Sequence, residues 1–148
     1  MLLMLIIGIG CLAMAAAFGI PVNKGQSDNI KNIVAAAVDT VNTAELASLL
    51  NQKNAQTSPQ AQRKATEITG KIVQWNLEVF VATKSGDFYQ VVTKSTPEVP
   101  GTLLRVYPRN NQQKNHLDSI KPGARIQVKG KISGTQQGRI KIDPAIIM

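Results

Sequence analysis

Cationic side chains are concentrated in the last third of the chain, where they could bind an anionic ligand. Between Arg105 and Lys141 there are nine Lys and Arg residues against one acid, Asp118. The remaining charges balance, so this stretch carries the whole formal net charge of +8. Such an excess attracts phosphate backbones, anionic lipid headgroups and acidic glycans.

An alternating pattern indicates how these cations are displayed. In residues 125–132, Ile126, Val128 and Ile132 occupy one face of a half-buried strand, and the pattern returns in residues 139–142. The opposite face would carry a basic stripe made of Arg125, Lys129, Lys131, Arg139 and Lys141. A solvated strand face with lysines that discourage edge pairing would show the same pattern. Ligand binding and simple solvation therefore both remain open.

Aromatic side chains on two earlier strands could add platforms on which bases stack. The candidates are Tyr89 or its neighbour Phe88, Tyr107 and Trp75. Aromatics are only 4% of the chain, so some must fill the core, and we assign Phe80 and one of the Phe88/Tyr89 pair to it. The candidate ligand-binding residues are Tyr89, Arg105, Tyr107, Arg125, Lys129, Lys131, Arg139 and Lys141.

Catalytic motifs are not found in the sequence. His116 is the only histidine and lies in a polar insertion, where a solvated side chain is expected. There is no Cys/His cluster with zinc spacing, and the acids are scattered without a pair suited to general acid–base work. We therefore expect a non-enzymatic protein without a metal or a cofactor.

The elements that would position these residues begin with two or three helices over residues 21–64. Apolar residues recur at helical spacing from Ile30 to Val41, which favours packing over partner binding. Asn42 and Glu45 resemble a capping box. Ser58-Pro59 would start a last helix that runs to about Lys64.

From Thr66 the spacing of apolar residues changes from that of helices to that of strands. The first strand changes phase near Val73, with Gly70 as the site of a bend. A turn at residues 84–87 leads into a second strand over 88–93, and a third strand follows over 102–107. A short helix around 113–120 then precedes the two alternating strands.

This order of elements resembles the OB-fold, a small five-stranded Greek-key barrel. Residues 117–132, with Lys121-Pro122-Gly123, are similar to the crossing from the helix to the fourth strand, and residues 66–72 are similar to the opening strand. The resemblance covers residues 65–148 and points to bacterial envelope OB-fold proteins, including exported or lipoprotein relatives of tRNA-anticodon-binding-like domains. It implies the fold but no ligand, because OB-folds bind nucleic acid, sugars and proteins.

The first twenty residues are uncharged and mostly apolar, which indicates export or membrane anchoring. Small residues around Ala17 suit cleavage of a signal peptide, although the usual Lys or Arg at the start is missing. The segment could instead stay as an anchor, or Cys11, preceded by Gly10, could be a lipidation site. A buried cytosolic helix is a further alternative.

Together these features predict an exported envelope binding module, periplasmic or membrane-anchored, whose partner is a protein or a glycan bound by the barrel face. Two alternatives remain open. The basic stripe could bind single-stranded nucleic acid, or the helices over residues 27–50 could dock the chain into an envelope or secretion assembly.

Overall fold

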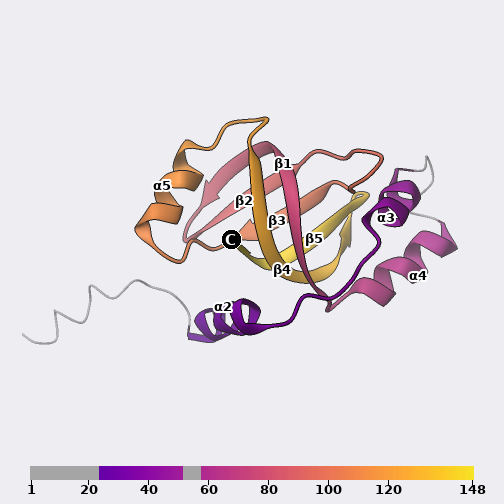
Figure 1. The fold of residues 1–148 in the computed structure, drawn as a ribbon, viewed down its shortest axis with the longest axis horizontal. Coiled ribbons are helices and arrows are strands. Elements are labelled where there is room, and N and C mark those ends of the chain that lie inside the picture. The colour runs from indigo at the N-terminus through magenta and orange to yellow at the C-terminus, as the bar shows by residue number, and fades with distance from the viewer. Residues whose placement is uncertain (1–23, 52–57) are drawn as a thin grey trace, which may run out of the picture.

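Three helices precede five strands in residues 24–51 and 58–148, the part of the chain that the computed structural model describes (Figure 1). The helices are α2 (Lys24–Ala35), α3 (Thr43–Leu50) and α4 (Pro59–Ile68), and α5 (Asn111–Ser119) lies between the third and fourth strands. The strands are β1 (Ile72–Ser85), β2 (Phe88–Thr93), β3 (Thr102–Val106), β4 (Arg125–Gln136) and β5 (Arg139–Ile147).

The strands close into a barrel in the order β1-β2-β3-β5-β4. The long strand β1 pairs with β4 along its first half and with β2 along its second half. Only the β3–β5 pair is parallel; the other pairs in the described chain are antiparallel. This topology, with a helix between β3 and β4, confirms the OB-fold barrel predicted from the sequence.

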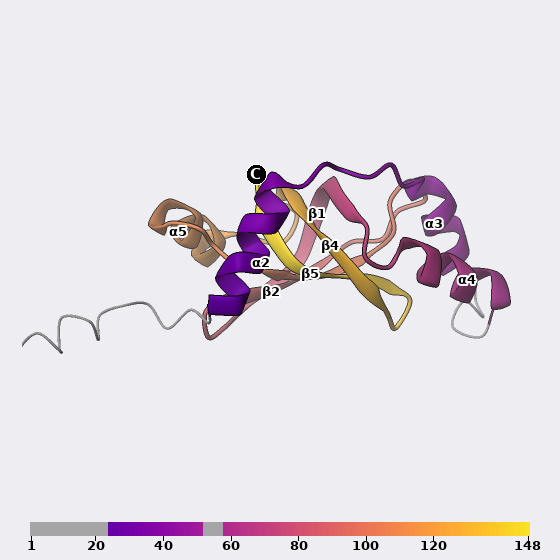
Figure 2. The same ribbon diagram turned by 90° about the horizontal axis from the view of Figure 1, so that it is seen from below.

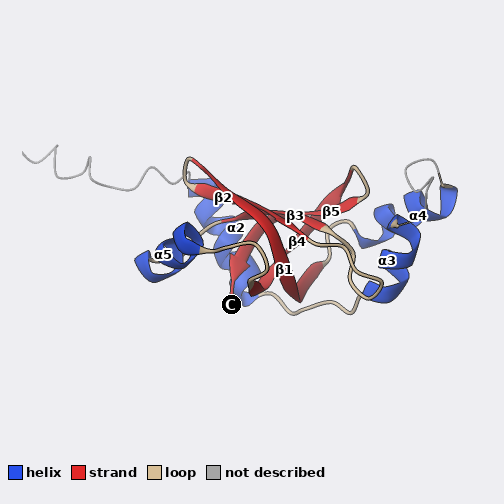
Figure 3. Cartoon of the chain, turned by 90° about the horizontal axis from the view of Figure 1, so that it is seen from above, coloured by secondary structure: helices blue, strands red, loops and turns tan. Residues whose placement is uncertain are grey.

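The barrel interior is filled by the inward residues of all five strands, as the alternation in residues 125–132 predicts. Ile126, Val128 and Ile132 are buried in one core cluster with residues from the other strands. The two ends of the barrel are covered by helices (Figures 1 and 3). Leu117 of α5 joins the core cluster, as do Leu46 of α3 and Ile68 of α4. Of the helices before the barrel, α3 and α4 therefore share its core.

Two helix starts form as expected. The Asn42 side chain accepts a hydrogen bond from the Glu45 backbone N–H at 3.1 Å, and the Ser58 hydroxyl oxygen accepts one from Ala61 at 3.4 Å. Each of these bonds satisfies a backbone donor that a first helical turn leaves unpaired.

The boundary between the last of these helices and the first strand was predicted wrongly. Helix α4 continues past Lys64 to Ile68, and β1 begins at Ile72, so the strand expected from Thr66 is helical at its start. Gly70 has a φ of +93° and lies in the turn between helix and strand, where its freedom to adopt positive φ is needed.

The change of phase expected near Val73 is also absent, because Val73, Leu77 and Val79 alternate on one buried face. The irregularity of β1 comes later, where the pairing with β2 shifts between Val79 and Val81. Phe80 lies within this shift and is 55% exposed, so its assignment to the core was wrong.

Helix α2 lies against the outside of β4 and β5 (Figure 2). Ile33 of α2 and Ile146 of β5 are both buried, yet neither belongs to the core cluster inside the barrel. Ile146 pairs with Lys129 across the β4–β5 ladder, so both side chains belong to the outer face that α2 covers. One part of the outer barrel surface is therefore closed to solvent.

The predicted export segment, with Cys11 and Ala17, lies outside the described residues. Within residues 24–51 and 58–148, no helix has the length and apolar character needed to cross a membrane.

Candidate ligand-binding face

The outer face of β1, β2 and β3 is the surface that the fold leaves uncovered by α2. Strand pairing places Val81 beside Val92 and Val92 beside Leu103, which gives an apolar row across the three strands. The next outward row brings Gln90 beside Arg105. We call these rows, with Phe80 and Phe88, the strand face.

A stacked pair marks one part of the strand face. The Arg105 guanidinium carbon lies 4.6 Å from the centroid of the Phe88 ring, within the range of a cation–π contact. The Phe88 and Tyr107 rings pack at 5.7 Å with an interplanar angle of 45°. Arg105 also pairs with the Asp143 carboxylate of β5 at 3.4 Å. The guanidinium is thereby held over an aromatic ring at the surface.

Exposed apolar side chains lie farther along the strand face, where β1 pairs with Val92 and not with Phe88. Phe80 is 55% exposed and Val81 is 41% exposed, both at the irregularity of β1. Sequence reasoning missed Phe80 because the shift in pairing breaks the alternation there. Phe88 was named only as the alternative to Tyr89, and neither it nor Phe80 is among the eight ligand-binding residues expected from the sequence.

The predicted basic stripe is not continuous. Lys129 is only 6% exposed, because its amine donates hydrogen bonds to the carbonyls of Val34 at 3.2 Å and Ala36 at 2.5 Å. Arg139 is half-buried and donates to the Thr93 carbonyl at 2.7 Å. Arg125 and Lys131 are exposed on β4, whereas Lys141 is half-buried on β5. Burial thus removes Lys129 from the surface stripe in which the sequence placed it.

Tyr89 points into the end of the barrel, and only 3% of it is exposed. Its hydroxyl donates a hydrogen bond to the Asp118 carboxylate at the end of α5. Burial, this hydrogen bond and the Asp118 charge raise the pKa of Tyr89 to about 12. Tyr89 therefore offers no open ring for stacking, which corrects its assignment as a platform.

Tyr107 is also largely buried. Burial raises its pKa, and the Asp143 charge acts in the same direction while Arg105 opposes both. Its ring supports Phe88 from beside the strand face.

Alkaline titration should reveal the environment of Tyr89. A Tyr107→Phe background leaves Tyr89 as the sole tyrosine, and tyrosinate absorbance should then give a pKa of about 12. Because this folded pKa lies above the unfolded one, the associated stability is complete below pH 10 and is lost as pH rises through 12. Asp118→Asn should lower the pKa, and an unchanged pKa in that variant would contradict the assignment.

Comparisons with known proteins give distant structural matches only. No protein-family model matches the chain, and no curated protein matches it. One similar solved structure is a "putative nucleic acid-binding lipoprotein" from Klebsiella pneumoniae, with 10% identity, a TM-score of 0.41, and coverage of 59% of this chain and 77% of that one. Another is the asparaginyl-tRNA synthetase of Pyrococcus horikoshii, with 11% identity, a TM-score of 0.41, and coverage of 62% of this chain and 22% of the synthetase.

These similarities are too low to transfer a function. The class of the protein follows instead from its own strand order: a closed five-stranded OB-fold barrel, preceded by helices of which α3 and α4 share its core.

Proposed function

We propose that this chain is a non-enzymatic binding module that holds single-stranded nucleic acid on its strand face. The observation that carries the proposal is the Arg105 guanidinium stacked over Phe88, with the exposed ring of Phe80 on the same face. Aromatic and guanidinium planes stack on nucleic-acid bases regardless of sequence, because every base has a π-face.

The charge of the chain supports the same ligand. The net charge of +8 favours association with a phosphate backbone, and Lys141 lies beside Leu103 at the edge of the strand face. Bases would stack on Phe80 and on the Arg105–Phe88 pair, while the backbone would be drawn by the cations of β5.

Oligonucleotide binding measured by fluorescence anisotropy tests this proposal. Strands of roughly 12 nucleotides suit the site size of one OB-fold. The double variant Phe80→Ala/Arg105→Ala should weaken binding by about 30-fold or more, since each of the two lost stacks contributes about 1–3 kcal/mol. The affinity of the wild type should also fall steeply with added salt, because bound cations release counterions.

The matched control is Arg125→Ala, which removes an exposed cation from β4, away from the strand face. It should change the salt dependence slightly and leave most of the affinity in place. Equal losses in the control and the double variant, or no measurable binding by the wild type, would overturn the proposal.

A protein ligand is the second candidate. It is favoured by the apolar row of Val81, Val92 and Leu103, continued by Phe80. The sequence analysis expects either a protein or a glycan as the partner, and an apolar row favours a protein. Binding of a partner protein that persists at high salt and is lost in Val81→Asp would favour this candidate. The location that residues 1–20 favour, an exported one in the cell envelope, remains part of the proposal.

A further inference from the structure

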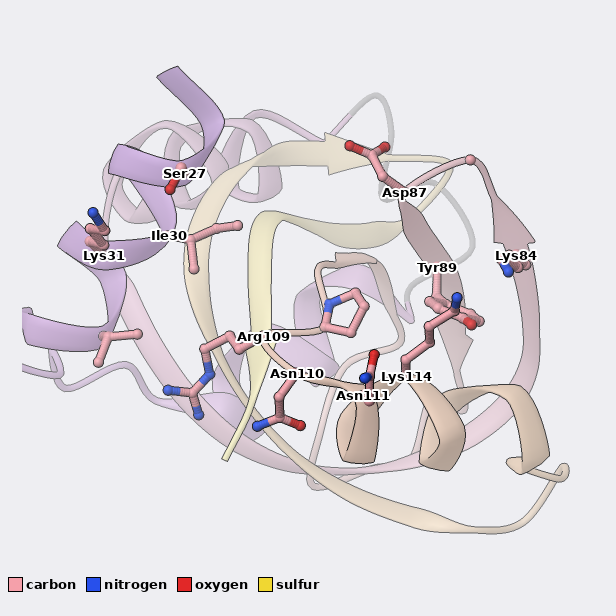
Figure 4. Close-up of a pocket in the computed structure, with 13 residues that line it drawn as sticks. Ser27, Ile30, Lys31, Lys84, Asp87, Tyr89, Arg109, Asn110, Asn111 and Lys114 are labelled. Atoms are coloured by element: carbon pink, nitrogen blue, oxygen red, sulfur yellow. The ribbon is translucent and has the colours of Figure 1, made fainter. Parts of the chain in front are cut away.

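A pocket of ≈ 620 Å³ lies between three segments that are far apart in the sequence. Its walls come from α2, from the end of β1 with the turn into β2, and from the β3–α5 connection with the start of α5 (Figure 4). This volume is within the range of small-molecule binding sites. The cations and apolar residues used in the argument below are Lys31, Lys84, Arg109, Lys114, Ile30 and Pro108.

The lining has a strong excess of positive charge. Four cations face one acid, Asp87, around the same hollow. Among the described residues, the amines of Lys31, Lys84 and Lys114 have neither a hydrogen-bond acceptor nor an ion-pair partner. A concave site lined by charges of one sign focuses the electrostatic field and concentrates ions of the opposite sign.

Arg109 is already held in position. Its Nη2 donates a hydrogen bond to the Ile147 carbonyl at 3.1 Å, and its backbone N–H donates to Gln113 Oε1 at 2.8 Å. Gln113 in turn donates to the same Ile147 carbonyl at 3.3 Å. The guanidinium is therefore fixed by the end of β5, while its remaining donors can form the paired hydrogen bonds that phosphate oxygens accept.

The cations fall into two groups. Figure 4 shows Lys31 and Arg109 toward the α2 side of the pocket, and Lys84 at the end of β1 and Lys114 on α5 toward the opposite side, near Tyr89. Apolar side chains, including Ile30 and Pro108, also line the pocket. A ligand with two phosphates could place one phosphate at each group.

We propose that this pocket binds a small organic bisphosphate, with one phosphate at each group of cations and the carbon skeleton against the apolar lining. Sugar bisphosphates and nucleoside bisphosphates share this chemistry. The site is separate from the strand face, and the proposal does not depend on nucleic-acid binding.

Isothermal titration calorimetry with three probes tests the proposal: fructose 1,6-bisphosphate, adenosine 3′,5′-bisphosphate and inorganic phosphate. Both bisphosphates, or one of them, should bind at least about 10-fold more tightly than inorganic phosphate, because a second charge-assisted contact is added. The bisphosphate that binds more tightly shows whether the pocket takes a sugar bisphosphate or a nucleoside bisphosphate. Lys31→Gln/Lys84→Gln/Lys114→Gln should weaken that binding by about 100-fold or more.

The matched control is Lys121→Gln/Arg125→Gln/Lys131→Gln, which removes the same charge from exposed positions that do not line the pocket. It should retain bisphosphate binding, and thermal melting should show that both triple variants fold. Three results would each overturn the proposal: no bisphosphate binding, equal affinity for inorganic phosphate, or equal losses in both triple variants. Oligonucleotide binding by Phe80→Ala/Arg105→Ala is measured separately. The proposal for the pocket and the proposal for the strand face can therefore be contradicted independently.

Discussion

Adding one methyl group at position 130, in Gly130→Ala, is expected to destabilise the barrel by about 3 kcal/mol. Gly130 is buried where β4 lies between its two neighbours, opposite Val73 of β1 and Ala145 of β5. A Cβ there would collide with the Ile142 side chain, and it would lie 2.7 Å from the Pro144 carbonyl oxygen and 3.0 Å from the Ala145 Cα. The close approach of β5 therefore requires glycine.

The size of this effect follows from what the new methyl group would meet. Overpacking a core commonly costs about 1–3 kcal/mol, because neighbouring side chains rotate away at moderate strain. Two of the three nearest atoms here belong to the β5 backbone, which can move only if the β4–β5 pairing is disturbed. The loss should therefore lie at the upper end of that range, a large share of the roughly 5–15 kcal/mol that stabilises a domain.

Urea denaturation, followed by circular dichroism, would measure the loss as a lower midpoint. Lys131→Ala is the matched control, since Lys131 is the next residue of β4 and is exposed. It should change the free energy of unfolding by no more than about 0.5 kcal/mol. A Gly130→Ala midpoint equal to that of the control would show that β5 does not approach β4 as closely as described.

The fold could be predicted because the strands carry their own signal. Residues 125–132 and 139–142 alternate between core and surface, and turns with Gly separate the other strands, so strand number and order followed from local pattern. The boundary between α4 and β1 was missed because the local pattern is ambiguous there. Ile68 is buried whether its segment is a helix or a strand, so its hydrophobicity does not distinguish the two.

The candidate site was only partly predictable. The outward direction of Arg105, Arg125 and Lys131 followed from alternation, and all three are exposed. The burial of Lys129 depends on α2, which lies more than ninety residues earlier in the chain. The basic pocket has no local signal either, because α2, the β1–β2 turn and the β3–α5 connection meet only in the folded barrel.

Replacing Lys129 by methionine is expected to release α2 from the barrel. The Lys129 amine donates to the carbonyls of Val34 and Ala36, and these bonds join the end of α2 to the outer face of β4. Methionine keeps an apolar stem of similar length beside Ile146 but leaves both carbonyls without this donor. Hydrogen bonds from a charged group contribute roughly 1.5–3 kcal/mol, so the helix should open about 10- to 100-fold more often.

Hydrogen exchange is the measurement that separates this local opening from global unfolding. Amides of residues 27–35 should exchange about 10- to 100-fold faster in Lys129→Met, while amides in the barrel core should keep their protection. Lys131→Met is the control, since it removes an exposed charge from the same strand. Unchanged exchange in α2 would mean that Ile33 and Ile146 hold the helix without Lys129. Because α2 forms one wall of the basic pocket, its release should also weaken bisphosphate binding, although Lys129 does not line that pocket.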